Sequence, residues 1–252
     1  MKKIALVTGV TSGIGLATAR ILAKNGYNLI ITGRRKELLE KVKTEITANT
    51  DAQVLDLNFD LRKRKDVVDA IASLPEKWKA IDVLVNNAGL ASGLDPIQSG
   101  DIEDWEKMID TNVKGLLYIT REVAPLMVAR NNGHIINISS IAGHEVYPNG
   151  NVYCATKHAV EALNKAMRMD MVKHNIKVTS IAPGMVETEF SIVRFHGDTN
   201  RAKKFYDGLT PLNADDIADA ILYVVTRPAH VCINEMLIMP TAQASATVVN
   251  RS

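Results

Sequence analysis

A glycine-rich turn near the start of the chain limits the available folds more than any other segment. A short apolar run, Ile4–Val7, leads into TGVTSGIG, and apolar residues then recur at helical spacing up to Gly26. Glycine permits a tight turn, and the N-terminus of a helix offers free N–H groups and a positive dipole to a pyrophosphate. Its position between a strand and a helix predicts a dinucleotide-binding turn. The expected cofactor contacts are Gly9, Thr11, Ser12, Gly13, Ile14 and Gly15.

The same alternation of strand and helix continues along the chain. Further strands are predicted at 28–32, 54–61, 81–85, 134–138, 177–182 and 236–239, and helices at 36–47, 63–74, 105–130, 151–174 and 215–226. Strands that alternate with helices form parallel sheets covered on both faces. We therefore expect an α/β fold, a Rossmann-type doubly wound parallel sheet of about seven strands flanked by helices on both faces, in a single domain over residues 1–252.

Composition narrows the classes of partner. The 252 residues carry 30 basic and 28 acidic side chains, so no basic stripe predicts nucleic acid and we expect a small-molecule substrate. No stretch approaches the roughly 18 apolar residues that would span a membrane, and the start reads better as a strand than as a secretion signal. Neither the two cysteines nor the histidines have metal-ligand spacing, so we expect no metal and a reducing cytoplasm.

The second predicted strand ends in Gly33-Arg34-Arg35, where a dinucleotide fold places the residue that meets the adenosine ribose. NAD-selective folds carry a carboxylate there, which binds the 2′-hydroxyl. Two arginines favour a 2′-phosphate instead, because guanidinium and phosphate form charged hydrogen bonds of about 1.5–3 kcal/mol each. We therefore expect Arg34 and Arg35 to bind NADP. The alternative is that both arginines are only solvent-exposed residues of a turn.

Small and polar residues end other predicted strands at the same edge of the sheet. Asp60-Leu61 closes the third strand, and Asp60 either meets the adenine amino group or caps the next helix. The fourth strand runs into Asn86-Asn87-Ala88-Gly89, where small residues let the backbone lie against a cofactor and Asn side chains can tie strands together. A simple turn is the alternative there. Pro183-Gly184 ends the sixth strand.

The chemistry is predicted at Tyr153 and Lys157, which lie four residues apart in a helical pattern and so project from the same side. An unperturbed tyrosine has a pKa of about 10, and a nearby ammonium group together with a bound cationic nicotinamide should lower it toward the range of a general base. Taken alone, the pair is better explained as a Tyr and a Lys on the solvent-exposed face of a surface helix, because Y-x-x-x-K is common by chance, and the rest of the chain is what favours the catalytic interpretation. Ser140 ends the fifth strand, where open α/β sheets bind ligands, and a loop can bring its hydroxyl to that of Tyr153.

Two further segments are candidates for the site. Asn112 lies inside the predicted helix 105–130, where asparagine is mildly unfavourable, so it either bends the helix to hold a water near Lys157 or is simply exposed. Residues 185–208 have no regular pattern, and we expect an irregular lid over the site. Arg194 in this lid is the candidate for binding a substrate carboxylate, because guanidinium holds a carboxylate in a fixed orientation. The alternative is that Arg194 pairs with a nearby acid or points to water.

Taken in order, TGVTSGIG, NNAG, Asn112, Ser140, the Y-x-x-x-K pair and Pro183-Gly184 resemble a short-chain dehydrogenase/reductase over nearly the whole chain. The resemblance implies that Tyr153 gives or accepts a proton and that Ser140 orients the substrate oxygen. It also implies that Lys157 binds the nicotinamide ribose and that Asn112 holds a water in the proton relay.

The resemblance extends to the cofactor and the assembly. It implies that Val186 and Thr188 hold the nicotinamide carboxamide, and that Asn87, Ala88 and Gly89 face the adenosine side of the cofactor. Family members commonly form tetramers with the helices of the catalytic residues at an interface, so a homotetramer is expected.

Within that family, the lid GMVETEFSIVRFHGD and the tail MPTAQAS are similar to NADP-dependent 3-hydroxy acid dehydrogenases. The similarity implies hydride transfer between NADP and a 3-hydroxy acid such as serine or L-allo-threonine, or the matching semialdehyde, with Ser140, Tyr153 and Arg194 at the substrate. Two alternatives stay open: an acyl-thioester ketoreductase, which needs room for a phosphopantetheine arm, and a non-catalytic NADP-sensing binding protein.

Overall fold

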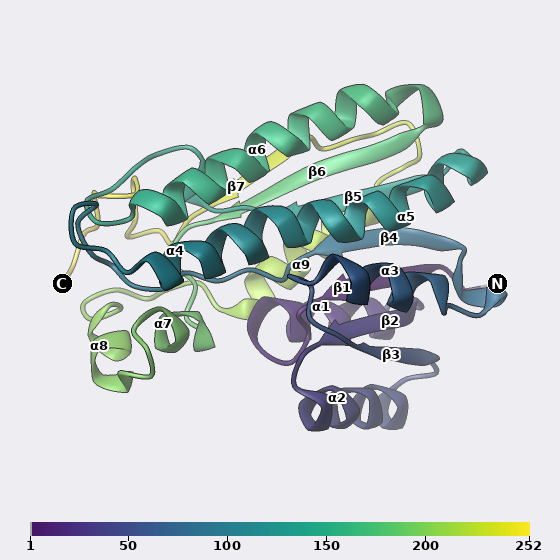
Figure 1. Cartoon of the computed structure of the whole chain (residues 1–252), viewed down its shortest axis with the longest axis horizontal. Helices are drawn as coiled ribbons and strands as arrows, with labels where there is room; N and C mark the ends of the chain where they lie inside the picture. Colours follow the sequence, from purple (N-terminus) through teal and green to yellow (C-terminus); the bar gives the residue numbers. More distant parts are fainter. Residues whose placement is uncertain (1) are drawn as a thin grey trace.

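The computed structural model describes residues 2–252, which form one sheet with helices on both faces (Figure 1). Within these residues the sheet has seven strands, all parallel, in the order β3-β2-β1-β4-β5-β6-β7. The predicted doubly wound fold is confirmed. The strands are β1 (Ile4–Thr8), β2 (Asn28–Gly33), β3 (Val54–Asn58), β4 (Ile81–Asn86), β5 (Gly133–Ile138), β6 (Ile176–Pro183) and β7 (Glu235–Ile238).

Two hydrophobic cores lie on opposite faces of the sheet, because successive side chains of a strand point to opposite sides. Ala5 and Val7 of β1 pack in one core, and Ile4 and Leu6 pack in the other. The first core includes side chains of α1 (Gly13–Lys24), α2 (Lys36–Asn49) and α9 (Ala214–Val225), and the second includes side chains of α3 (Arg64–Ala72), α5 (Leu116–Arg130) and α6 (Asn151–Met171).

The strand order creates the place for a ligand. From β1 the chain moves outward through β2 and β3, then returns to add β4 on the other side of β1. The loops that follow β1 and β4 therefore leave the sheet edge in different directions. Such a switch point leaves a crevice at the carboxyl ends of the strands.

The third strand is shorter than predicted. β3 ends at Asn58 instead of Leu61, because the chain turns around Asp60. The Asp60 carboxylate accepts a hydrogen bond from the backbone N–H of Arg62 (3.0 Å) and pairs with its guanidinium (2.7 Å). The following helix has Lys63 at its N-cap, so Asp60 does not cap it.

The long helix predicted from Trp105 to Arg130 begins earlier and is divided. It starts with α4 (Ile102–Ile109), continues through a wide π-helical turn at Asp110–Gly115, and ends as α5, which contains Pro125. Asn112 lies in the π turn, so the expected irregularity falls where the unfavourable asparagine predicts it.

The lid at 185–208 is more regular than predicted, since it contains two short helices, α7 (Glu189–Arg194) and α8 (Thr199–Lys204). Thr188 and Asp198 cap them. Each side chain accepts a hydrogen bond from a backbone N–H in the first turn, at 3.2 and 2.9 Å respectively. These caps start helices that are too short to show apolar periodicity.

The tail after Pro240 returns to its own chain. The side-chain oxygen of Gln243 accepts a hydrogen bond from the backbone N–H of Met185 (2.8 Å), and the backbone N–H of Ala246 donates to Glu145 (2.8 Å). The tail thus supports the lid of its own chain. None of the helices within residues 2–252 combines the length and the apolar character needed to cross a membrane.

Candidate active site

A cleft of about 520 Å³ lies at the carboxyl ends of the strands, between the loops after β1 to β6 and the lid. Gly15 and Asn112, both predicted to belong to the site, do not line it. The other predicted residues do: Gly9, Thr11, Ser12, Gly13, Ile14, Arg34, Arg35, Asp60, Leu61, Asn87, Ala88, Gly89, Ser140, Tyr153, Lys157, Pro183, Gly184, Val186, Thr188 and Arg194.

The glycine turn between β1 and α1 has the shape of an anion cradle. Gly9 and Gly13 have φ angles of +71° and +54°, which favour glycine. Gly15 lies behind the turn, where a Cβ atom would stand 2.3 Å from the carbonyl oxygen of Gly9. Its role is therefore to allow close packing. Ser12 precedes α1 without capping it, so N–H groups at the start of the helix are available to an anionic ligand.

Side chains tie β1 to β4 at the switch point. The Thr8 hydroxyl accepts hydrogen bonds from the backbone N–H groups of Asn87 and Ala88, both at 3.0 Å. The Asn87 amide donates to the carbonyl oxygens of Thr8 (2.8 Å) and Gly9 (3.1 Å). The predicted role of an asparagine in joining neighbouring strands is confirmed for Asn87. These hydrogen bonds between the loops after β1 and β4 fix the shape of the glycine turn.

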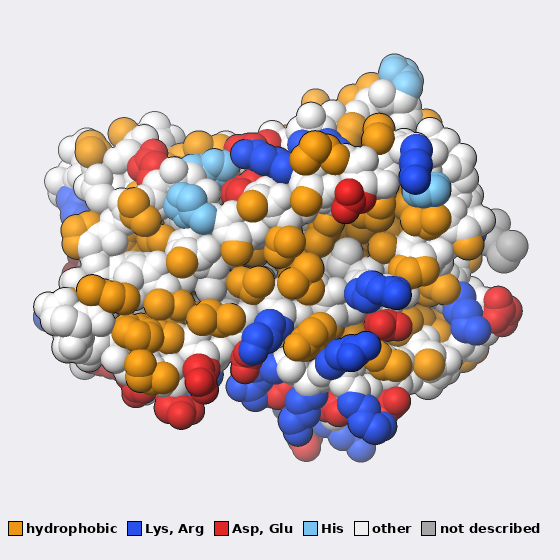
Figure 2. All heavy atoms as spheres, turned by 45° about the horizontal axis from the view of Figure 1, so that its top comes forward, with side chains coloured by type: hydrophobic (Ala, Val, Ile, Leu, Met, Phe, Trp, Pro, Cys, Tyr) orange, Lys and Arg blue, Asp and Glu red, His pale blue; other side chains and the backbone are white. Residues whose placement is uncertain are grey.

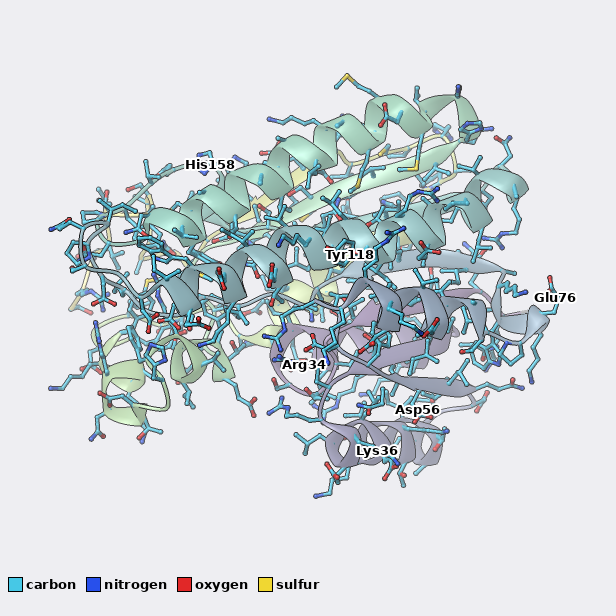
Figure 3. The ribbon with its side chains drawn as sticks, viewed as in Figure 1. Arg34, Lys36, Asp56, Glu76, Tyr118 and His158 are labelled. Carbon is cyan, nitrogen blue, oxygen red and sulfur yellow. The ribbon has the colours of Figure 1, made fainter. Side chains whose placement is uncertain are left out.

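Arg34 and Arg35 lie beyond the end of β2, and both line the cleft (Figure 3 labels Arg34). Arg34 is exposed. The Arg35 guanidinium donates to the Thr11 hydroxyl (2.7 Å) and pairs with Glu189 of the lid (3.2 Å). Exposed guanidinium groups at this edge suit a ligand phosphate, although the pair with Glu189 competes for Arg35.

Asp60 lines the cleft as an ionised carboxylate. Burial opposes its charge, but hydrogen bonds from Arg62 and the positive charge of Arg34 outweigh that effect and lower the pKa of Asp60. Its two oxygens face the Arg62 guanidinium at 2.7 and 3.1 Å. A contact from Asp60 to an adenine amino group must therefore share the carboxylate with Arg62.

Ser140, Tyr153 and Lys157 meet at the centre of the cleft, and all three are buried. Ser140 caps the short turn after β5, where its hydroxyl accepts a hydrogen bond from the backbone N–H of Ala142 (3.1 Å). The Lys157 ammonium lies 5.9 Å from the ring centre of Tyr153 and donates to the carbonyl oxygen of Ile138 (2.8 Å). The three side chains thus lie together in the cleft, as predicted.

The pKa of Tyr153 departs from the prediction. Burial raises it above its ordinary value, and the groups that oppose this effect are the Ser140 hydroxyl and the Arg194 charge. In this structure Lys157 is not among the groups that lower the pKa of Tyr153, and its ammonium donates to the Ile138 carbonyl. Burial also lowers the pKa of Lys157 to about 8, against the opposing charge of Glu161. Tyr153 therefore keeps its proton at neutral pH.

Asn112 holds a loop in place. Its side-chain oxygen accepts a hydrogen bond from the backbone N–H of Leu90 (2.8 Å), and its amide donates to the Leu90 carbonyl (2.8 Å) and the Thr156 hydroxyl (3.1 Å). The side chain is buried, so the alternative that it is simply exposed is wrong. It joins the loop after β4 to α6, the helix of Tyr153.

Arg194 is only 5% exposed and points into the cleft. Its guanidinium lies over the rings of Tyr147 (5.5 Å) and Tyr153 (5.6 Å), and it donates to the Tyr147 hydroxyl (3.0 Å). Within residues 2–252 no carboxylate lies within 4.0 Å of it, and its Nε has no hydrogen-bond partner. The alternative that Arg194 pairs with a nearby acid or points to water is therefore wrong.

Asp104 of α4 fastens the lid to the body of the protein. This carboxylate is 3% exposed, and it accepts a hydrogen bond from the Ser92 hydroxyl (2.6 Å) and pairs with His196 of the lid (3.0 Å). Next to it, the backbone N–H of Gly93 donates to the carbonyl oxygen of Arg194 (2.9 Å). The segment that carries Arg194 is thus held on both sides.

The arrangement of the glycine turn, Ser140, Tyr153 and Lys157 has a counterpart among known sequences. A sequence model of the family described as short chain dehydrogenase matches residues 3–198, which include all four features. The chain belongs to this family. The resemblance drawn from the motifs is confirmed.

Curated relatives cover nearly the whole of this short-chain dehydrogenase. The NADP-dependent 3-hydroxy acid dehydrogenase YdfG of Salmonella typhi is 50% identical over 251 residues, which are 99% of this chain and 100% of the relative. The NADP-dependent 3-hydroxy acid dehydrogenase of Schizosaccharomyces pombe is 42% identical over 250 residues, 99% of this chain and 96% of the relative.

Solved structures agree with these sequences. The closed form of serine dehydrogenase complexed with NADP+ superposes with a TM-score of 0.92 and 46% identity, over 99% of this chain and 100% of that chain. Serine dehydrogenase from Escherichia coli superposes with a TM-score of 0.83 and 42% identity, over 96% and 99% of the two chains. The fold of this dehydrogenase is therefore shared with both.

The residues that line the cleft and that sequence reasoning missed include Tyr147, Phe190 and Gln243. Phe190 packs its ring against that of Tyr153 at 5.7 Å between centres. Tyr147 lies in the loop that joins the turn after Ser140 to α6, and a tyrosine between two predicted catalytic residues is a usable signal. Gln243 carries no such signal, because its contact with the lid spans 58 residues.

Proposed function

We propose that this short-chain dehydrogenase transfers a hydride between NADP and the hydroxyl-bearing carbon of a 3-hydroxy acid such as serine or L-allo-threonine, or the matching semialdehyde. One observation carries the substrate class: the buried Arg194 guanidinium and the Tyr153 hydroxyl share one cleft. A guanidinium without an acidic partner suits a carboxylate, and a tyrosine beside a serine suits a hydroxyl.

The cleft fits the cofactor. The positive φ angles of Gly9 and Gly13 and the uncapped start of α1 suit a pyrophosphate, and Arg34 and Arg35 suit a 2′-phosphate. The similarity to NADP-dependent relatives supports this choice. When bound, NADP supplies the hydride acceptor or donor, and the remaining steps belong to the protein. Other residues that we propose to hold it are Thr11, Ser12, Ile14, Asp60, Leu61, Asn87, Ala88, Gly89, Pro183, Gly184, Val186 and Thr188.

Tyr153 moves the proton. In the reducing direction it donates its phenol proton to the developing alkoxide, and the raised pKa means that the acid form is populated at neutral pH. In the oxidising direction it must first lose that proton, and the neighbouring Ser140 hydroxyl favours the phenolate. Ser140 orients the substrate oxygen, and Lys157, which lines the same cleft, binds the nicotinamide ribose.

Asn112 acts indirectly, by positioning other groups. It bonds to both backbone polar groups of Leu90 and to Thr156, so we propose that it fixes the loop after β4 against the catalytic helix. The wide turn in which it lies suits a water near Lys157, in agreement with the family's relay.

The deciding assay compares serine, L-allo-threonine, serine methyl ester and an acyl thioester with NADP+ or NAD+, read at the absorbance of the reduced nicotinamide. The methyl ester keeps the hydroxyl but removes the carboxylate charge. We expect the free acids to be preferred. Preference for the thioester would support the ketoreductase instead, and absence of turnover with every substrate would support a cofactor-sensing protein.

The same assay tests the cofactor. We expect NADP+ to exceed NAD+ in kcat/KM by one to two orders of magnitude, which is about 1.4–2.8 kcal/mol, because NAD+ loses the charged hydrogen bonds of the 2′-phosphate and solvent weakens these at exposed guanidinium groups. Replacing both Arg34 and Arg35 by alanine should narrow that gap. Equal kcat/KM for the two cofactors in the unmodified enzyme would refute the assignment.

We further propose a cytoplasmic homotetramer. Apolar side chains are spread over the face of the molecule drawn in Figure 2, and exposed apolar residues of the helices α4, α5 and α6 include Ile109, Leu117 and Met169. Association of copies would cover them. An exposed free thiol at Cys232 suits a reducing compartment. Light scattering on the purified protein measures the assembly, and a monomeric mass would contradict it.

A further inference from the structure

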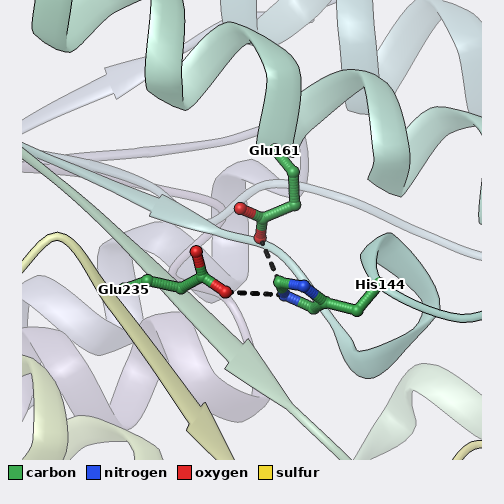
Figure 4. A group of neighbouring side chains, drawn as sticks. All are labelled: His144, Glu161 and Glu235. Carbon is green, nitrogen blue, oxygen red and sulfur yellow. Dashed lines mark ion pairs between the residues drawn. The ribbon is translucent and has the colours of Figure 1, made fainter.

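A cluster of three ligand-type side chains lies outside the cleft. His144 follows the turn after Ser140, Glu161 lies on α6, and Glu235 begins β7 (Figure 4). The imidazole and the two carboxylates each offer one ligand atom, and these atoms lie within 4.8 Å of one another. None of the three residues lines the cleft.

The most buried member is incompletely satisfied. Glu161 is 4% exposed, and its Oε1 accepts a hydrogen bond from Ser180 (2.6 Å), while its Oε2 has no hydrogen-bond partner. The Nε2 atom of His144 is likewise buried without one. In the described part of the chain no lysine or arginine lies within 4.0 Å of Glu161 or Glu235. Lys157 is one turn away and forms no ion pair with Glu161, so a cation bound directly to the carboxylate would stabilise its buried charge.

The spacing of the ligand atoms fits a cation better than a hydrogen-bonded triad. His144 Nε2 lies 3.4 Å from Glu161 Oε1 and 3.4 Å from Glu235 Oε1. Charge-assisted hydrogen bonds are shorter, at about 2.7–2.9 Å. Ligand atoms on a tetrahedral metal with bonds of about 2.0–2.1 Å are separated by about 3.3–3.4 Å. The observed separations match the edges of such a tetrahedron.

We propose that His144, Glu161 and Glu235 bind one divalent transition-metal cation of the zinc class. An imidazole with two carboxylates suits zinc, whereas magnesium and calcium prefer oxygen ligands alone. Two carboxylates also balance the charge of the cation. The His144 and Glu235 side chains are 24% and 38% exposed, so the cation can enter from solvent and keep a water as its fourth ligand.

The site joins three segments, two of which adjoin or carry catalytic residues. His144 lies four residues after Ser140, and Glu161 lies one turn after Lys157 on the same helix. Glu235 begins the edge strand β7. A cation that holds all three would fix the turn after Ser140 against α6 and the edge of the sheet. Its role is structural, and binding is measurable without turnover.

The test uses the full-length protein, freed of metal by a chelator and dialysed against buffered micromolar Zn²⁺, with bound zinc counted by mass spectrometry. We expect one Zn²⁺ per chain and a higher Tm. His144→Asn and Glu235→Gln should each weaken binding at least ~10-fold. Both residues are partly exposed, so circular dichroism should show that these variants fold.

His158→Asn is the matched control. His158 is an exposed histidine on α6, the helix that carries Glu161, and it lies on the outside of the molecule (Figure 3). It should bind Zn²⁺ as the unmodified protein does. Co²⁺ should give the visible absorption of a tetrahedral site, and this absorption should be lost in His144→Asn. The proposal is overturned if the unmodified protein binds no zinc, if zinc binding survives both ligand substitutions, or if equimolar Mg²⁺ displaces the zinc.

Discussion

The floor of the cleft, formed by the glycine turn and α6, is built into the sheet and a long buried helix, whereas the lid at 185–208 is attached to the rest of the protein by a few side chains. In the floor, the N–H of Gly9 donates to the carbonyl oxygen of Thr32 (3.0 Å), and Tyr153 and Lys157 extend from a buried helix. The lid depends on Asp104 and Gln243, which lie 92 and 58 residues from their lid partners.

This difference predicts a division of labour. A floor fixed by backbone geometry suits groups that must stay in place throughout the reaction, such as the proton donor and the cofactor cradle. A lid fixed by a few polar contacts can open at small cost, because each such contact contributes only about 1 kcal/mol. Changes to the floor should therefore affect kcat and cofactor binding, and changes to the lid should affect KM for the substrate.

The largest expected effect is that of Tyr153→Phe in the floor. It should lower kcat by about 10²–10⁴-fold, because general acid-base catalysis is worth that much, while the fold and cofactor affinity stay unchanged. Steady-state kinetics and cofactor titration measure both quantities. Tyr147→Phe is the control, since it removes a hydroxyl from the same cleft and should change kcat by less than about 10-fold. Normal turnover by the Tyr153 variant would reduce Tyr153 to a packing residue.

The next effect concerns the glycine turn. Gly15→Ala should weaken cofactor binding by roughly 100-fold, because its Cβ would meet the Gly9 carbonyl at 2.3 Å and overpacking costs up to about 3 kcal/mol. Gly197→Ala in the lid is the control. Unlike Gly15, Gly197 has a positive φ angle, +91°, but nothing lies within 4 Å of its added Cβ and it lies in the lid, so the substitution should leave cofactor affinity nearly unchanged. Fluorescence titration with NADPH compares the two. Equal losses of NADPH affinity in the two variants would mean that the glycine turn and the lid respond alike to an added Cβ atom.

Arg194→Ala should act on the substrate. It should raise KM for serine by roughly 30-fold, since a hydrogen bond to a charged group contributes about 2 kcal/mol, and leave KM for serine methyl ester little affected. Arg201→Ala is the matched control, because this second lid arginine lies over Phe195 at 4.5 Å, outside the cleft lining. A uniform rise for charged and uncharged substrates would show that the substitution loosens the lid, and the carboxylate partner would then have to be sought elsewhere.

The floor was also the part that the sequence predicted best. The glycine turn and the Tyr153–Lys157 spacing are local patterns, and local patterns fix backbone geometry over a few residues. The end of β3 was missed because the Asp60–Arg62 turn overrides a run of residues that favours a strand. The raised pKa of Tyr153 was not predicted because burial, which no spacing reveals, outweighs the charge of a neighbour.

The contacts of the lid cannot be predicted from local sequence patterns. The buried position of Arg194 depends on Tyr147, 47 residues away, and on the Gly93 N–H bond to its carbonyl. The cluster of His144, Glu161 and Glu235 is similar, because its members come from three elements and share no ligand spacing. Contacts of this kind require the fold to be known before they can be seen.

The smallest expected effect is that of Asp104→Asn, which weakens the contact between α4 and the lid. Its buried carboxylate pairs with His196 at 3.0 Å, but the imidazole is 59% exposed, so solvent screens the pair. A loss of about 1 kcal/mol should raise KM for serine by roughly 5-fold. The value of kcat should stay nearly constant, because the floor is untouched.

The rate of trypsin cleavage measures how firmly the lid is held, because the exposed helix α8 of the lid carries Arg201, Lys203 and Lys204. Asp104→Asn should speed cleavage there, and saturating serine with NADP+ should slow it again. Asp219→Asn, an exposed aspartate on α9, should behave as the unmodified protein does. If Asp104→Asn instead lowered kcat while cleavage in α8 stayed slow, the effect of Asp104 would pass through the floor, and the division between the two regions would fail at this residue.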